Sequence, residues 1–138
     1  MPTREERDTE GRFAERYSVA QTDVTRGIER VVIGGDWGAN GYTTVAQADA
    51  LAHLLRLRTG MRLLDLGAGR GWPGLYLAGS TGCDVVLSDV PVEGLRAAGT
   101  RARHERLSDR SAAVVASARL LPFRARAFDA IVHTDVLC

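Results

Sequence analysis

The run from Leu63 to Gly71, with the sequence LLDLGAGRG, constrains the fold of this chain more than any other segment. It is a short apolar stretch containing one acid, followed by three glycines at alternate positions. Such a run indicates a buried strand that ends in a tight turn. Because glycine has no Cβ, the turn leaves bare backbone that a ligand can approach closely. The segment therefore predicts a nucleotide-type cofactor site.

The glycines permit two registers. Gly69 to Gly74 matches the G-x-G-x-x-G pattern of dinucleotide enzymes, but that pattern should begin directly at the end of the strand, and here it begins two residues later. Counting from Gly67 gives G-x-G-x-G and puts Pro73 in the first turn of the next helix, where a missing N–H costs little. The second register fits better, and a nicotinamide dinucleotide site stays as the alternative.

Residues 61–79 resemble the first motif of class I S-adenosylmethionine-dependent methyltransferases, in the small-molecule, type 11 group. The resemblance extends to residue 138 through Asp89, a Leu-Pro-Phe loop at 121–123 and Phe128-Asp129 at the start of a fourth strand. It implies a sheet ordered 3-2-1-4-5-7-6, of which this chain holds the cofactor half, 3-2-1-4. We therefore expect a methyltransferase truncated after its fourth strand. An unpaired strand-four edge favours self-association, so a non-catalytic fragment that associates through this edge is a further alternative.

Alternating strand and helix patterns from residue 61 onward predict a Rossmann-like, doubly wound α/β sheet. We expect strands near 61–66, 83–88, 112–116 and 127–133, with helices near 73–79 and 91–107. Before them, helical patterns cover Arg4–Tyr17, Thr22–Ile33 and Thr44–Arg58. The predicted organisation is a helical extension or lid at 1–60 and an S-adenosylmethionine-binding domain at 61–138.

Composition narrows the classes of function. A formal net charge of +1 gives the chain no strong overall positive potential, so the composition does not indicate nucleic-acid binding. The sequence contains no lysine, which excludes a Schiff-base lysine and a phosphate-loop lysine. Cys83 and Cys138 have neither metal-site spacing nor the density of a disulfide scaffold, so we expect a reducing cytoplasm. No apolar run approaches the roughly 20 residues that span a membrane, and we expect no membrane partner.

The resemblance assigns the cofactor residues position by position. Backbone at Gly67, Ala68 and Gly69 can approach the methionine part of the ligand, and Gly71 completes the motif. Asp65 is implied to contact the methionine amino group, directly or through water; the alternative is an acid that accepts hydrogen bonds from loop N–H groups. Asp89, 18 residues after Gly71, is implied to accept both ribose hydroxyls.

The remaining cofactor positions follow from the same comparison. Val90 is expected to pack on the adenine face. Ser117, followed by Ala118 and Arg119, stands where the family often has an acid that accepts the adenine amino group; its alternative role is only to end a strand. In the glycine-rich segment 34–43, Trp37 and Tyr42 are expected either to close over the cofactor or to pack on the sheet edge.

The end of the fourth strand faces the transferred methyl in this family. Its residues, Ile131 to Asp135, contain neither an Asn/Asp-Pro-Pro-aromatic sequence nor a Pro-Cys nucleophile, which leaves O- or N-methylation of a small-molecule acceptor. His133 is the candidate base, because an unperturbed imidazole titrates near neutrality. Asp135 is a second candidate base. We predict no metal site.

Overall fold

The centre of the molecule is a parallel sheet with two crossover connections, each of which joins neighbouring strands through a helix. In the computed structural model, which describes residues 1–135, β1 (Arg62–Leu66), β2 (Asp84–Asp89), β3 (Ser111–Val115) and β4 (Ala130–Val132) form one parallel sheet in the order β3-β2-β1-β4. Helix α4 (Gly74–Thr81) connects β1 to β2, and α5 (Val92–His104) with the 3₁₀ turn η1 (Ser108–Arg110) connects β2 to β3. The predicted fold class and strand order are confirmed.

Three helices precede the sheet: α1 (Arg4–Ser18), α2 (Asp23–Ile33) and α3 (Val45–Leu54). Each begins at a threonine whose hydroxyl accepts the N–H of the third helical residue, a regular N-cap. The third helix is shorter than the predicted Thr44–Arg58 because the chain turns at Arg56, which has a left-handed φ of 52°. As a result Leu57 packs into the core, whereas Leu54 remains exposed.

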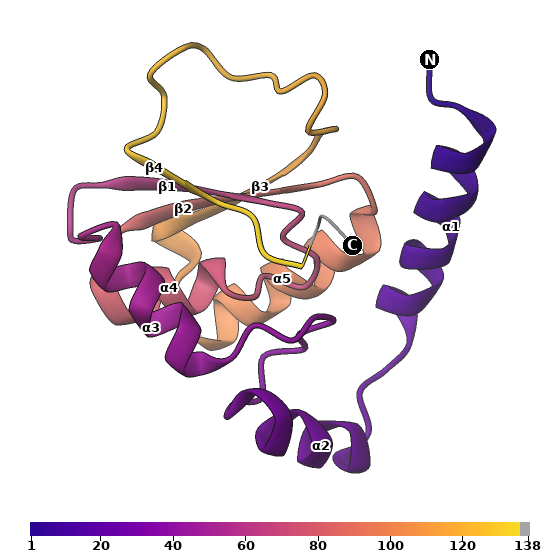
Figure 1. Ribbon diagram of the computed structural model, residues 1–138, viewed down its shortest axis with the longest axis horizontal. Helices are drawn as coiled ribbons and strands as arrows, with labels where there is room; N and C mark the ends of the chain where they lie inside the picture. Colours follow the sequence, from indigo (N-terminus) through magenta and orange to yellow (C-terminus); the bar gives the residue numbers. More distant parts are fainter. Residues whose placement is uncertain (136–138) are drawn as a thin grey trace.

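The core lies between the sheet and the helices that cover one of its faces. Figure 1 shows α3, α4 and α5 on the same side of the strands, with the segment between β3 and β4 on the other side. Strand register brings Leu63 of β1 beside Val85 of β2, and both are buried against this helical layer. Burial of these branched side chains contributes about 1.5–3 kcal/mol each.

The strands are close to their predicted positions, and β4 differs most. The pattern predicted a strand over 127–133, but only Ala130–Val132 pair with β1. Asp129 explains the later start: its carboxylate accepts the N–H of Arg62 at 2.8 Å, so the residue closes the end of the ladder with its side chain. Its own N–H donates to the Arg62 carbonyl.

Helix α1 stands apart from the core, along the side of the molecule next to α5 (Figure 1). It buries no residue completely. Among residues 1–135, none of the helices combines the length and apolar character that crossing a membrane requires. Cys138 lies outside the described residues.

Candidate functional site

The turn after β1 has the backbone that the glycine pattern predicted. Gly67, Gly69 and Gly71 have φ angles of 69°, 51° and 97°, a region that residues with a Cβ rarely adopt. The N–H groups of Gly67 and Ala68 both donate to the carbonyl of Ser88 at the end of β2, at 2.8 and 3.1 Å. The neighbouring strand therefore holds the turn in place.

Close packing adds a second requirement for glycine at two of these positions. A Cβ at Gly71 would lie 2.6 Å from a Leu75 methyl, so this residue lets α4 pack on the turn. A Cβ at Gly69 would lie 2.9 Å from the Tyr17 hydroxyl of α1. Gly69 is thus the point at which the N-terminal helix reaches the turn.

Asp65 is the buried acid of β1, with 1% of its surface exposed. Its Oδ2 accepts the N–H of Gly74 at 2.8 Å, at the start of α4. Burial raises the pKa of Asp65 to about 8, with a further contribution from the charge of Asp89, while the Gly74 hydrogen bond opposes the shift. The carboxyl group thus accepts a backbone hydrogen bond at the start of α4, and its contact with the methionine amino group stays a prediction.

Asp89 ends β2 with both carboxylate oxygens bound to backbone. Oδ2 accepts the N–H of Gly69 at 2.7 Å, and Oδ1 accepts that of Val90 at 2.8 Å. Burial raises the pKa of Asp89, and these two hydrogen bonds act in the opposite direction. Val90 is half-buried beside it. The acid is therefore fixed at the carboxyl edge of the sheet, directly against the glycine turn.

A small cavity of about 60 Å³ lies between this turn, the segment 38–41, α1 and the end of β4. Several parts of the chain that are distant in sequence line it: Phe13, Tyr17, Gly38, Ala39, Asn40, Gly41, Gly67, Ala68, Gly69, Arg70, Trp72, Thr134 and Asp135. Asn40 contributes a polar group to this wall. Its Nδ2 is buried, and the amide interacts with Tyr17: burial raises the pKa of Tyr17, and a side-chain hydrogen bond with Asn40 opposes this shift. A buried amide next to a cavity fits a polar ligand.

The segment 34–43 is fixed from two sides. Glu29 of α2 is 8% exposed and accepts the N–H groups of Trp37, Gly38 and Ala39. At the other end, Asp135 Oδ2 accepts from the N–H and hydroxyl of Thr43, at 3.2 and 2.8 Å.

The two aromatic residues predicted as a lid do not lie together over the turn. Trp37 packs against Trp72 and Tyr76, with ring centroids 5.8 and 5.5 Å away. Trp37 thus packs on the turn and on α4, which differs from the predicted packing on the sheet edge. Tyr42 is 81% exposed and does not line the cavity. Its contact with a cofactor stays a prediction.

The residues predicted at the adenine end follow β3 in an exposed segment. Ser117, Ala118 and Arg119 are all exposed, and the Arg119 N–H donates to the Ser117 hydroxyl at 3.2 Å. The Arg119 guanidinium forms an ion pair with Glu6 of α1. This contact connects the predicted adenine side of the site to the N-terminal helix.

At the end of β4, His133 is exposed and lies outside the cavity lining, whereas Thr134 and Asp135 belong to it. The role of His133 as a base stays a prediction.

Sequence reasoning missed Tyr17, Asn40 and Arg70, all of which line the cavity. Asn40 stands between glycines in the segment 38–41, which was a detectable signal for a turn at the site. Tyr17 and Arg70 had no local signal, because their importance comes from contact between α1 and the turn.

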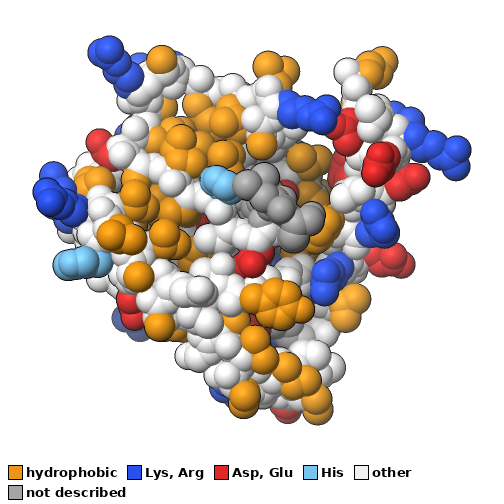
Figure 2. All heavy atoms as spheres, in the orientation of Figure 1, with side chains coloured by type: hydrophobic (Ala, Val, Ile, Leu, Met, Phe, Trp, Pro, Cys, Tyr) orange, Lys and Arg blue, Asp and Glu red, His pale blue; other side chains and the backbone are white. Residues whose placement is uncertain are grey.

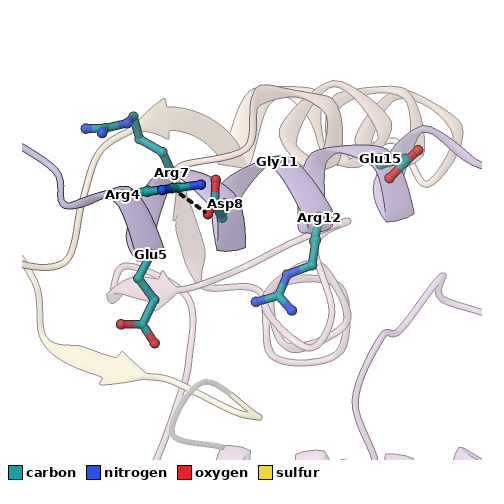
Figure 3. Close-up of a pocket in the computed structure, with 7 residues that line it drawn as sticks. All are labelled: Arg4, Glu5, Arg7, Asp8, Gly11, Arg12 and Glu15. Carbon is teal, nitrogen blue, oxygen red and sulfur yellow. Dashed lines mark ion pairs between the residues drawn. The ribbon is translucent and has the colours of Figure 1, made fainter.

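The seven residues labelled in Figure 3 line a separate, shallow depression on α1, from Arg4 to Glu15. They all come from one helix, the charged ones alternate in sign, and Arg4 pairs with Asp8 at 3.9 Å. None of them lines the cavity at the glycine turn.

Comparison with known proteins supports the predicted family. A family model described as "Methyltransferase domain" matches residues 63–138. The 27-O-demethylrifamycin SV methyltransferase of Amycolatopsis mediterranei is 34% identical over 110 residues, which are 69% of this chain and 40% of that protein. The chain thus spans well under half the length of this curated relative.

Two solved structures are similar in both fold and sequence. A SAM-dependent methyltransferase from Geobacter sulfurreducens, in complex with S-adenosyl-L-homocysteine, has a TM-score of 0.50 and 29% identity, covering 54% of this chain and 30% of its own. The cyclase SpnF has a TM-score of 0.61 and 30% identity, covering 72% and 37%. The first supports the predicted cofactor. The second shows that related chains have other activities.

The matched segment contains β1 with its glycine turn, β2 with Asp89, and both remaining strands, and it makes up more than half of the chain. The predicted family is therefore confirmed: this chain belongs to the methyltransferase domain family.

Proposed function

We propose that this chain binds S-adenosylmethionine across the carboxyl edge of its sheet, with Asp89 accepting the ribose hydroxyls. The observation that carries this proposal is the anchoring of Asp89 by the N–H groups of Gly69 and Val90. A carboxylate offers about four lone-pair positions, so about two are left to accept hydroxyl groups. These free lone-pair positions lie at the edge of the sheet where cofactors bind in open α/β folds.

The other contacts follow from this placement. The methionine part lies against Gly67, Ala68 and Gly69, where bare backbone and the cavity leave room and where the buried Asn40 amide lines the wall. Asp65 stabilises the turn by accepting the N–H of Gly74, at the start of the helix that follows the turn. The adenine extends past Val90 toward Ser117, Ala118 and Arg119. Gly71 acts through packing, and Tyr42 closes over the ligand from the segment 34–43.

The acceptor that we propose is an oxygen or nitrogen of a small molecule, methylated by the whole protein. S-adenosylmethionine supplies a methyl group activated by its sulfonium. Methylation of a hydroxyl or protonated amine also requires loss of a proton, which His133 accepts at the end of β4. The name of the rifamycin relative, an O-methyltransferase acting on a small molecule, supports this class of acceptor.

Calorimetric titration with S-adenosylhomocysteine, with NADH in parallel, tests the cofactor. We expect saturable binding of S-adenosylhomocysteine alone. Asp89→Ala should weaken it by about tenfold or more, because hydrogen bonds to a charged acceptor contribute about 1.5–3 kcal/mol. The matched control is Asp84→Ala, an exposed acid at the opposite end of the same strand. Binding of NADH instead would favour the dinucleotide alternative.

Transfer of a labelled methyl group tests the acceptor, with 27-O-demethylrifamycin SV, small amines and RNA as separate substrates. We expect labelling of a small molecule and none of RNA. His133→Gln should leave the S-adenosylhomocysteine affinity unchanged and slow transfer by about 10²-fold or more. Labelling of RNA would overturn the acceptor class. An unchanged rate in the variant would remove His133 as the base.

The edge of the sheet favours a second proposal, that the chain associates with itself through β4. Ile131 is 53% exposed on this strand, and among residues 1–135 β4 pairs only with β1. Edge strands with exposed apolar side chains favour pairing with another chain. Light scattering over a range of concentrations tests this. A constant monomer mass would contradict it.

A further inference from the structure

Arg70 leaves the glycine turn and binds the end of α1. Its Nη2 lies within hydrogen-bond distance of the carbonyl oxygens of Arg16, Tyr17 and Val19, at 3.0, 3.1 and 2.8 Å. The last carbonyls of a helix have no partner within the helix, and they carry its negative partial charge. A guanidinium is well suited to this position because it donates several hydrogen bonds from a fixed plane.

The contact also fixes Tyr17. The Arg70 guanidinium carbon lies 5.9 Å from the centroid of the Tyr17 ring, a cation–π distance. On its other side, the ring and hydroxyl of Tyr17 lie against Gly69 and Gly94, where added Cβ atoms would be 2.9 and 3.0 Å from Tyr17. Tyr17 is therefore held between Arg70, the glycine turn and the start of α5.

Besides the Arg70 contact, α1 is held by its packing along α5 and by an ion pair near its first turn. The helix has no fully buried residue, and its ion pair from Glu6 to Arg119 involves an arginine that is 78% exposed. Exposed pairs contribute little to stability. By contrast Arg70 is half-buried, and a Cβ on the neighbouring Gly38 would lie 3.1 Å from its side chain.

The two elements that Arg70 joins are opposite walls of one cavity. Phe13 and Tyr17 line it from α1, and Gly67 to Arg70 line it from the turn. A ligand in this cavity contacts both walls. Its binding and the docking of α1 must therefore strengthen each other by the same free energy.

We propose that Arg70 is a positioning residue that latches α1 onto the glycine turn, so that Tyr17 completes the methionine end of the cofactor site. This rests on the proposed binding of S-adenosylmethionine. The latch adds a specific consequence: cofactor affinity depends on a side chain that lines the cavity but donates its hydrogen bonds to the end of a helix.

Hydrogen exchange and calorimetry on the whole chain test the latch together. Arg70→Met keeps the aliphatic stem and removes the donors. We expect faster amide exchange in residues 4–18 without ligand, unchanged exchange in β1 and β2, and S-adenosylhomocysteine affinity weakened by about tenfold. Arg70→Lys should recover part of both effects, since an ammonium still donates to carbonyls.

Arg12→Met is the matched control, because Arg12 belongs to the same helix and, within the described part of the chain, donates its side-chain hydrogen bond locally, to Thr9. It should change neither measurement. Equal affinity in Arg70→Met and wild type, or unchanged exchange of α1 in that variant, would overturn the latch. Failure of the cofactor proposal is separate: it would appear as no binding by the wild type, while the exchange of unliganded α1 still tests the contact.

Discussion

The glycine turn and helix α1 bound the same cavity but are held in place differently. The turn is bonded by its own backbone to the end of β2, and Ala68, Gly69 and Gly71 are buried. Helix α1 has no fully buried residue, and it is held by packing along α5 and by polar side chains of other elements. Folding of the sheet therefore fixes the turn, whereas a small number of contacts decides where α1 lies. Segments with few buried contacts open more easily than the core.

The largest effect that we expect is a pH dependence of the free energy of unfolding, caused by Asp65 beneath the glycine turn. In the unfolded chain this carboxyl has its ordinary pKa of 3.8, whereas burial raises the pKa to about 8 in the folded protein. Between these values the folded state holds a proton that the unfolded state has lost. The contribution of Asp65 to stability must therefore fall as pH rises from about 4 to 8, by at most about 1.4 kcal/mol per pH unit.

Urea unfolding of wild type and Asp65→Asn across this pH range measures that contribution. The asparagine keeps an oxygen to accept the Gly74 N–H but does not titrate near neutrality, so the variant should lose this decline. Asp84→Asn, at the exposed start of β2, should keep it. Parallel curves for wild type and Asp65→Asn would show that the buried carboxyl has an ordinary pKa in the folded protein.

Gly94→Ala should give the next largest loss, because it forces the turn and α5 apart. The new Cβ would lie 2.7 Å from the carbonyl oxygen of Gly69. Overpacking against backbone costs about 1–3 kcal/mol. Gly99→Ala is a close control in the same helix, since its Cβ would meet only an arginine end at 4.0 Å, and it should stabilise by up to about 1 kcal/mol. A destabilising Gly99→Ala would mean that helix propensity does not govern α5.

Glu29→Ala should act mainly on the N-terminal side of the cavity. It leaves three backbone N–H groups of residues 37–39 without their acceptor, which costs about 1–3 kcal/mol. Hydrogen exchange should rise in the segment 34–43 and stay unchanged in β1 and β2. Glu10→Ala, an exposed acid of α1, serves as the control. Equal loss of protection in the sheet would show that both regions unfold as one unit.

These contrasts explain how far the sequence could predict the structure. The strands, the turn and the position of Asp89 depend on short-range patterns: an apolar run, alternate glycines and an acid at a strand end. The order of the strands was implied by the resemblance to class I methyltransferases. The end of α3 was wrong by four residues because an apolar stripe through Leu57 suggested more helix, whereas Leu57 is buried after a left-handed residue.

The contacts of the N-terminal segment were beyond prediction for a different reason. Arg70 and Arg16 are 54 positions apart, and Thr43 and Asp135 are 92 apart. Neither pair has a periodicity or spacing that marks it. Trp37 illustrates the same limit: its neighbours Trp72 and Tyr76 come from the turn and α4, whereas its place in the glycine-rich segment suggested only a lid or packing on the sheet edge.

Apolar side chains on α2 show that exposure is not confined to α1. Val24, Ile28 and Val31 are 72%, 58% and 86% exposed, and Figure 2 shows apolar side chains at the lower end of the molecule, where Figure 1 places this helix. The helix is nevertheless anchored by Glu29 and the buried Ile33. Anchoring through one face and exposure of the other thus distinguish α2 from α1.

Arg119→Ala should have the smallest effect and is the sharpest test of what holds α1. It removes the ion pair with Glu6 at the opposite end of the helix from Arg70. Because Arg119 is 78% exposed, water and salt screen this pair, and the urea midpoint should not change measurably. Amide exchange of residues 4–18 should also match wild type at both low and high salt. If amide exchange of residues 4–18 instead became as fast in this variant as in Arg70→Met, α1 would depend on both contacts acting together. Its docking would then weaken as salt is added, and α1 would be held as firmly as the glycine turn only at low ionic strength.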